Sequence, residues 1–98
     1  MTKEKILAYL HEHKDDFYDR YGITNIALFG SYAKGCETKS SDIDILIEME
    51  DGIKDIHDKK EHFRDTLQKA FGKKVDIARA KYLKKLAKDE IEKNLCYA

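Results

Sequence analysis

The residues best suited to chemistry lie in three short stretches of the sequence. Asp42 and Asp44 stand two positions apart in an apolar run, and Asp76 lies in a second apolar run further along. Side chains at i and i+2 of a strand face the same way, with Cα atoms about 6.5–7 Å apart, so Asp42 and Asp44 could grip one hard cation or a pair. An acid within an apolar strand is costly to bury unless a cation offsets its charge. Three carboxylates therefore converge if the strand of Asp76 lies beside that of Asp42 and Asp44.

A candidate phosphate-binding loop precedes these acids. Gly30 and Ser31 follow an apolar stretch that ends at Phe29. A glycine lets the backbone approach an anion closely, and a serine that opens a short helix offers a hydroxyl and free N–H groups to a phosphate. A helix cap at Ser31 would use the same geometry. Together with three carboxylates, the loop indicates a two-metal phosphoryl-transfer site in which Mg²⁺ ions orient a triphosphate.

The first half of the chain predicts one helix and two strands. Helical spacing of apolar residues predicts an amphipathic helix from about Thr2, a candidate N-cap, to about Tyr21, which Gly22 ends. The apolar segment Ile23 to Phe29 is short and bounded by glycines, which indicates a buried strand. The second strand is Ser41 to Met49. One of its faces carries Ile43, Ile45 and Ile47, and the other carries Asp42, Asp44, Leu46 and Glu48.

The second half predicts a helix, a strand and a helix. A helical period runs from Ile53 to Ala70 and closes at Gly72, and Val75 to Ala78 forms a third short strand. A last, basic helix, in which Cys96 is expected to pack, is marked by Leu83, Leu86, Ile91 and Leu95. This order of elements predicts an α/β (α+β) fold, a small mixed β-sheet with helices packed on it.

Three motifs give the chain a resemblance to a known family. They are Leu28-Phe29-Gly30-Ser31, Ser41-Asp42-Ile43-Asp44 and Val75-Asp76-Ile77. The constellation resembles the nucleotidyltransferase superfamily typified by DNA polymerase β. More narrowly, it is similar to the minimal nucleotidyltransferases, the MNT antitoxins encoded beside HEPN-domain toxins in bacteria and archaea. The resemblance covers nearly the whole chain. One departure is Lys34 where many members carry arginine, which keeps the charge but gives up the planar fork.

The resemblance implies a nucleotidyltransferase fold and a role for each motif residue. Asp42, Asp44 and Asp76 are the expected catalytic residues and ligands of two Mg²⁺ ions, and Gly30 and Ser31 are the expected nucleotide-binding residues. The substrate that the resemblance implies is ATP or another NTP. The chain would move a nucleoside monophosphate, AMP from ATP, to a hydroxyl group of a HEPN toxin, with a tyrosine as acceptor, and would thereby act as an antitoxin.

Length and composition limit the remaining possibilities. The 98 residues predict a single domain, 1–98, with the acceptor presented by another protein. Nineteen basic and nineteen acidic residues cancel, which disfavours sequence-independent binding of nucleic acid. No apolar run in the sequence is long enough to span a bilayer, and the polar, amphipathic start of the sequence leads us to expect no secretory signal. Two cysteines outside any CxxC motif fit a reducing cytoplasm.

Two other functions compete with this interpretation. The chain could neutralise a toxin only by covering it, because occlusion needs surface complementarity and leaves no motif. It could instead modify nucleic-acid ends, which zero net charge makes the weakest hypothesis. The sequence leaves open which NTP is used, which residue accepts, how many nucleotides are added, and the oligomeric state.

Overall fold

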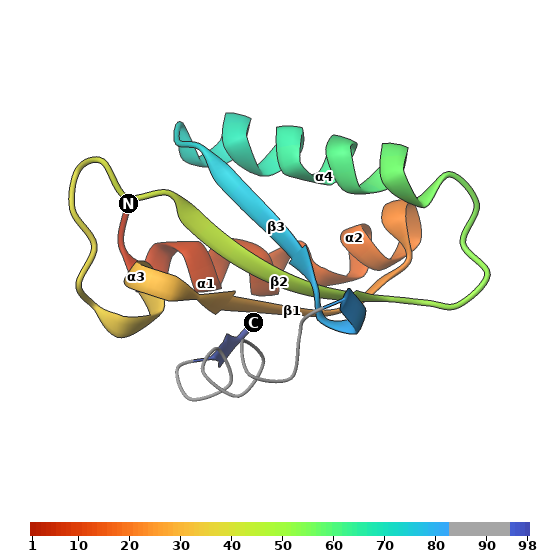
Figure 1. The fold of residues 1–98 in the computed structure, drawn as a ribbon, viewed down its shortest axis with the longest axis horizontal. Helices are drawn as coiled ribbons and strands as arrows, with labels where there is room; N and C mark the ends of the chain where they lie inside the picture. Colours follow the sequence, from red (N-terminus) through yellow and green to blue (C-terminus); the bar gives the residue numbers. More distant parts are fainter. Residues whose placement is uncertain (83–94) are drawn as a thin grey trace.

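The computed structural model describes residues 1–82 and 95–98 and contains a four-stranded sheet in the order β3-β2-β1-β4 (Figure 1). The strands are β1 (Ile23–Phe29), β2 (Ile43–Met49), β3 (Val75–Arg79) and β4 (Cys96–Tyr97). β1 pairs antiparallel with β2 and with β4, whereas β2 pairs parallel with β3. The predicted mixed sheet is confirmed, and so is the placement of the third strand beside the second.

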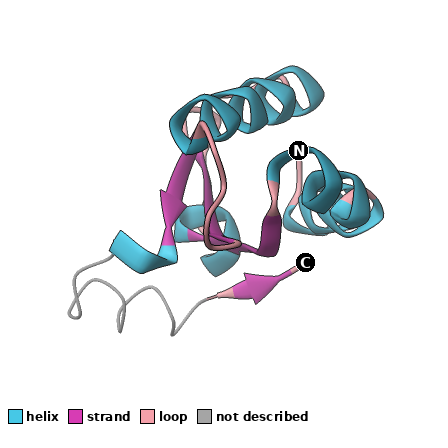
Figure 2. Ribbon diagram, turned by 90° about the vertical axis from the view of Figure 1, so that its right-hand side faces the viewer, coloured by secondary structure: helices cyan, strands magenta, loops and turns pink. Residues whose placement is uncertain are grey.

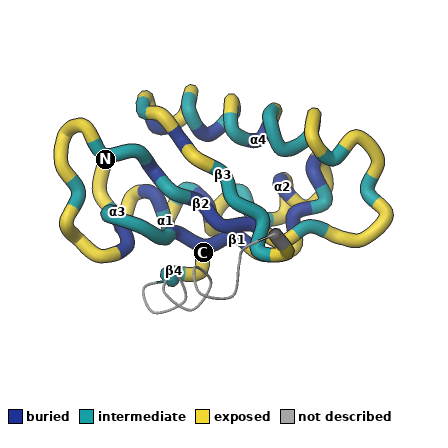
Figure 3. The backbone as a smooth tube through the Cα atoms, in the orientation of Figure 1, coloured by how far each residue is buried: buried dark blue, intermediate teal, exposed yellow. Residues whose placement is uncertain are grey.

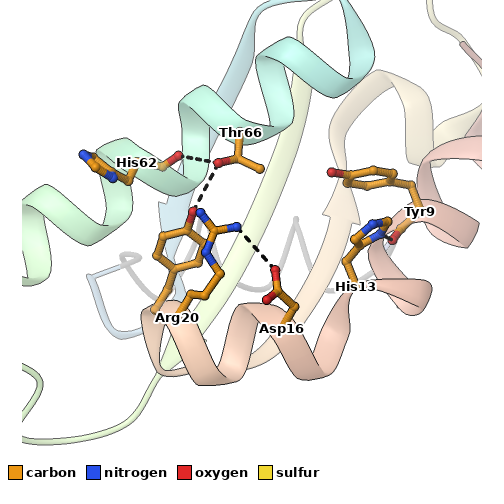
Figure 4. A network of polar contacts seen from close by, with 7 residues as sticks. Tyr9, His13, Asp16, Arg20, His62 and Thr66 are labelled. Atoms are coloured by element: carbon orange, nitrogen blue, oxygen red, sulfur yellow. Dashed lines mark hydrogen bonds and ion pairs between the residues drawn. The ribbon is translucent and has the colours of Figure 1, made fainter.

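The predicted N-terminal helix is two helices. They are α1 (Lys3–Glu12) and α2 (Lys14–Tyr21), and His13 between them leaves the helical conformation, with φ −101° and ψ 10°. The His13 ring stacks on Tyr9, and its Nδ1 lies 2.9 Å from the Tyr9 carbonyl oxygen (Figure 4). The prediction of one continuous helix was wrong. The break at His13 could not be predicted, because the sequence has neither glycine nor proline there. The predicted cap is confirmed, since Thr2 Oγ1 accepts a hydrogen bond from the Lys5 amide at 3.2 Å.

Helix α4 (Ile56–Phe71) begins later than its apolar period predicts. Ile53 lies ahead of the helix, because Asp55, the residue before α4, has a left-handed conformation with φ 54°. Gly72 ends the helix with φ 66°, as predicted. Between α2 and α4, Tyr21 and Thr66 share a hydrogen bond of 3.1 Å, and the Thr66 hydroxyl donates to the His62 carbonyl (Figure 4).

The C-terminal end of the chain differs from the prediction. Residues 83–94, which include Leu83, Leu86 and Ile91 of the predicted last helix, lie outside the described residues. Leu95 is not helical, and Cys96 lies in β4 and not in a helix. The two residues of β4 pair with Ala27 and Leu28 of β1. Cys96 is half-buried and packs against the core, so its packing role holds in a strand.

The core lies between the sheet and the helices α1, α2 and α4, which share one side of the sheet (Figure 2). Ile43, Ile45 and Ile47 of β2 are fully buried, as their alternation predicts. Buried apolar residues from the three helices cover them, and the burial follows the inner sides of these elements (Figure 3): Ile6, Leu10, Phe17, Phe63 and Leu67. Among the described residues, no helix is both long and apolar enough to cross a membrane.

Candidate active site

The end of β1 and the start of β2 bring Gly30 against Asp44. Phe29, the last residue of β1, is the cross-strand partner of Asp44, and the chain turns at Gly30 into the short helix α3 (Gly30–Lys34). Gly30 has φ +73°, a conformation that L side chains rarely adopt. A Cβ atom added there would lie 2.2 Å from Oδ2 of Asp44. Glycine is therefore required both by the backbone and by the close approach of the carboxylate.

Two of the three predicted acids lie on neighbouring strands, and the third lies just before one of them. Asp44 and Asp76 are register partners across the parallel pair β2 and β3. Asp42 lies one residue before β2, which begins at Ile43 and not at Ser41 as predicted. Asp42 and Asp44 are half-buried, but Asp76 is exposed. The expectation that Asp76 is a buried acid was wrong, because β3 is an edge strand and Asp76 faces away from the helices. The expected convergence with Asp42 and Asp44 rests on strand register and not on burial.

Electrostatic repulsion is the clearest physical property of this group of acids. Burial is the main cause that raises the pKa of Asp44, and the charges of Asp76 and Asp42 raise it further. A bound cation would offset this repulsion, which is the behaviour expected of ligands for a hard divalent metal. Within residues 1–82 and 95–98, no three His, Cys, Asp or Glu side chains already form a metal-binding group. The ligand set predicted from Asp42, Asp44 and Asp76 thus needs small side-chain movements, with substrate phosphates supplying further oxygens.

Helix α3 places Ser31 directly after Gly30, the residue that approaches Asp44. Its N-cap is Phe29, which makes no side-chain cap bond, so the alternative in which Ser31 caps the helix was wrong. Ser31 is half-buried in the first turn, and the next two residues, Tyr32 and Ala33, are buried and anchor the helix to the core. The Ser31 hydroxyl thus stands on a fixed support directly after Gly30. This position suits contact with a phosphate held near Asp44.

Two lysines near the acids were not singled out from the sequence. Lys74 Nζ lies 3.7 Å from Asp42 Oδ2, with both side chains substantially exposed, so this ion pair contributes little to stability. Lys73 Nζ donates to the carbonyl oxygens of Lys39 and Ser41. Both contacts join positions more than 30 residues apart, and no local pattern in the sequence could have revealed them.

Two cavities lined by described residues lie away from the acids. One, of about 530 Å³, has a mixed-charge lining from α2, α4 and the turn before α4: Arg20, Tyr21, Asp55, Asp58, Lys59 and His62. Another, of about 300 Å³, lies at the opposite ends of β2 and β3 from the acids. Asp76 is exposed, and Asp42 and Asp44 are half-buried, so all three acids are accessible in part.

Similarity to known proteins agrees with this geometry. The family model described as the nucleotidyltransferase domain matches residues 10–97. A protein of Methanocaldococcus jannaschii, provisionally named a protein adenylyltransferase, is 36% identical over 97 residues, which are 98% of this chain and 97% of that protein. The chain belongs to the nucleotidyltransferase family. It is therefore an enzyme of this class, and the resemblance seen in its motifs is confirmed.

Solved structures of low identity confirm the fold of this nucleotidyltransferase. A structure provisionally assigned as a minimal nucleotidyltransferase superposes with a TM-score of 0.79 at 24% identity, covering 98% of this chain and 95% of the other. One chain from a structure of the tri-AMPylated Shewanella oneidensis HEPN toxin in complex with MNT antitoxin superposes with a TM-score of 0.67 at 18% identity, covering 98% of this chain and 71% of the other. At these identities the likeness concerns the fold.

Proposed function

We propose that this nucleotidyltransferase transfers AMP from ATP to a hydroxyl group of a HEPN toxin and acts in this way as an antitoxin in the cytoplasm. The observation that carries the proposal is the approach of Asp44 to Gly30, with Asp76 on the neighbouring strand and Asp42 just before β2. It puts a repelling group of acids directly beside a candidate phosphate site. The name of the Methanocaldococcus jannaschii relative supports protein as the acceptor, and the Shewanella oneidensis complex supports a HEPN toxin as the partner.

Each residue of the site has a role in the proposed reaction. Asp42, Asp44 and Asp76 would hold Mg²⁺, which when bound neutralises phosphate charge and aligns the triphosphate. The backbone at Gly30 and the Ser31 hydroxyl bind phosphate oxygens and orient the α-phosphate. Asp76, the most exposed of the acids, takes the proton of the acceptor hydroxyl.

The transfer is a single displacement at phosphorus. The acceptor oxygen forms a bond to the α-phosphorus, and the bond from this phosphorus to the α,β-bridging oxygen breaks. Pyrophosphate leaves with that oxygen and with the bonding electron pair. The exposure of Asp76 suits an acceptor that is presented by another folded protein, here a tyrosine hydroxyl of the toxin.

Intact mass spectrometry tests the proposal directly. The purified chain is incubated with Mg²⁺, ATP and the protein encoded by the neighbouring gene, if that protein is HEPN-like, and the intact masses of both proteins are measured. We expect the partner to gain one or more AMP units, and the Asp42→Asn, Asp44→Asn double variant to add none. A stable complex that blocks the toxin without any mass gain would instead support neutralisation by occlusion. A double variant that transfers AMP at the normal rate would show that these acids are not the catalytic residues.

A further inference from the structure

We propose that Lys73 is a positioning residue. It fixes the loop of residues 35–42, which joins the candidate phosphate-binding residues Gly30 and Ser31 to Asp44 of β2. Lys73 Nζ donates a hydrogen bond to the carbonyl oxygen of Lys39 at 3.0 Å and a longer one to that of Ser41 at 3.5 Å. The same ammonium lies 5.9 Å from the centroid of the Tyr32 ring. One side chain from the connection between α4 and β3 thus reaches both α3 and the residues just before Asp42.

The loop of residues 35–42 needs such a contact. It follows the candidate phosphate-binding residues and leads into Asp42, and it contains neither helix nor strand. At its start, the Cys36 amide donates to the Ser31 carbonyl of α3 at 3.0 Å. Further along, the Thr38 amide donates to Ser41 Oγ at 2.9 Å, and the Ser41 amide donates to the Thr38 carbonyl at 3.1 Å. These last two bonds shape the turn at 38–41 but do not join it to the rest of the protein. Lys73 supplies a tie from a position 34 residues away.

The chemistry at Nζ favours lysine for this task. An ammonium has three donors that point in different directions, so it can serve two carbonyl oxygens and still face an aromatic ring. The ring belongs to Tyr32, which is only 2% exposed and is therefore held by the core. Lys73 thereby holds the loop in a fixed position relative to the buried Tyr32 of α3, the residue next to Ser31.

The neighbouring lysine shows that this role is separate from charge neutralisation. Lys74 faces Asp42, and its side chain is 66% exposed. Lys73 is half-buried, and its hydrogen bonds go to backbone carbonyls. Loss of Lys73 should therefore change where Asp42 lies, whereas loss of Lys74 should change the charge around it.

The proposal rests on the proposed function and is tested by two independent measurements. The variants are Lys73→Met, which keeps the length of the stem but loses the donors, and Lys73→Arg, which keeps donors. Lys69→Met, at an exposed site on α4, is the matched control. Hydrogen exchange of the ligand-free protein should show amides of residues 36–42 exchanging about tenfold faster in Lys73→Met, because local opening becomes easier. The rest of the chain and the control should be unchanged.

Steady-state transfer to the toxin provides the second measurement. We expect kcat/KM for ATP to fall by about 10- to 100-fold in Lys73→Met, the loss typical of a misplaced catalytic group, and to recover in large part in Lys73→Arg. Should Lys73→Met fail to fold, Lys73→Gln takes its place in both measurements. Unchanged exchange in the loop would overturn the proposal, and so would faster exchange with unchanged transfer. A parent protein that transfers no AMP overturns the proposed function, and hydrogen exchange alone then decides whether Lys73 holds the loop.

Discussion

The two faces of β2 lie within one short strand and yet obey opposite rules. On the face toward α1, α2 and α4, Ile43, Ile45 and Ile47 are fully buried in the core. On the other face, Asp44 is half-buried and is repelled by Asp76 of the neighbouring strand and by Asp42, the residue just before β2. Burial of the first face stabilises the folded state, because apolar side chains are removed from water. The charges on the second face destabilise the folded state unless a cation is bound.

As a result, adjacent residues of β2 serve different properties, one stability and the next activity. Neighbouring residues such as Asp44 and Ile45 point to opposite faces, so a substitution at one leaves the other in place. The packed isoleucine face fixes the position of β2, and so a small domain can hold repelling acids close to one another. Substitutions on the two faces should therefore move different observables.

The largest effect is expected on the acid face. Replacing Asp42 and Asp44 together by asparagine should lower the rate of AMP transfer by about 10³-fold or more, because metal-assisted charge stabilisation is worth several kcal/mol. The melting temperature should stay the same or rise, because repulsion with Asp76 is removed. Transfer assays and thermal denaturation measure the two quantities. Asp65→Asn, at an exposed position on α4, is the control and should change neither.

The core face should show the opposite behaviour. Ile45→Ala deletes a fully buried side chain and should lower the free energy of unfolding by about 2–5 kcal/mol. The rate of transfer per folded molecule should be nearly unchanged. Denaturant titration gives the first quantity, and activity normalised to the folded fraction gives the second. A variant of normal stability but low activity would mean that the two faces are not separable.

Gly30 lies where the two rules meet, and its substitution should affect both observables. In Gly30→Ala the positive φ costs about 1–2 kcal/mol of stability. The new Cβ would also displace the Asp44 carboxylate, which should lower transfer by about 100-fold. The matched control is Gly35→Ala, because Gly35 has φ +74° but no atom within 4 Å of an added Cβ. Equal loss of activity in the two variants would show that strain alone, and not contact with Asp44, explains the effect.

The sequence predicted those parts of the molecule that depend on local patterns. The bounds of β1, the Thr2 cap, the Gly22 and Gly72 helix ends and the alternation in β2 all follow from neighbouring residues. Strand β4 was missed because its two residues form a strand only through pairing with Ala27 and Leu28. Lys73 was missed because its partners lie more than 30 positions earlier.

The positions of the acids follow in part from the sequence and in part from the pairing of the strands. Spacing in the sequence placed Asp42 and Asp44 on one face, and the register of β2 with β3 adds Asp76 at the level of Asp44. The exposure of Asp76 could not be predicted, because an edge strand and a central strand can have the same apolar neighbours.

The smallest expected effect is a pH dependence of stability that comes from Asp44. Because its pKa is raised in the folded protein, the folded state binds the proton more readily than the unfolded chain, whose carboxyl titrates near 3.8. In the absence of divalent cations, this residue should add stability as the pH falls through the raised folded pKa. The contribution is complete below the unfolded value and is lost at neutral pH. Asp44→Asn should therefore be more stable than the parent at pH 7, and this advantage should shrink as the pH falls toward 3.8. Denaturant titrations of both proteins with a chelator present measure the difference. An advantage that grows toward acidic pH would mean that the folded protein stabilises ionised Asp44, and the account of repelling acids on this face would then be wrong.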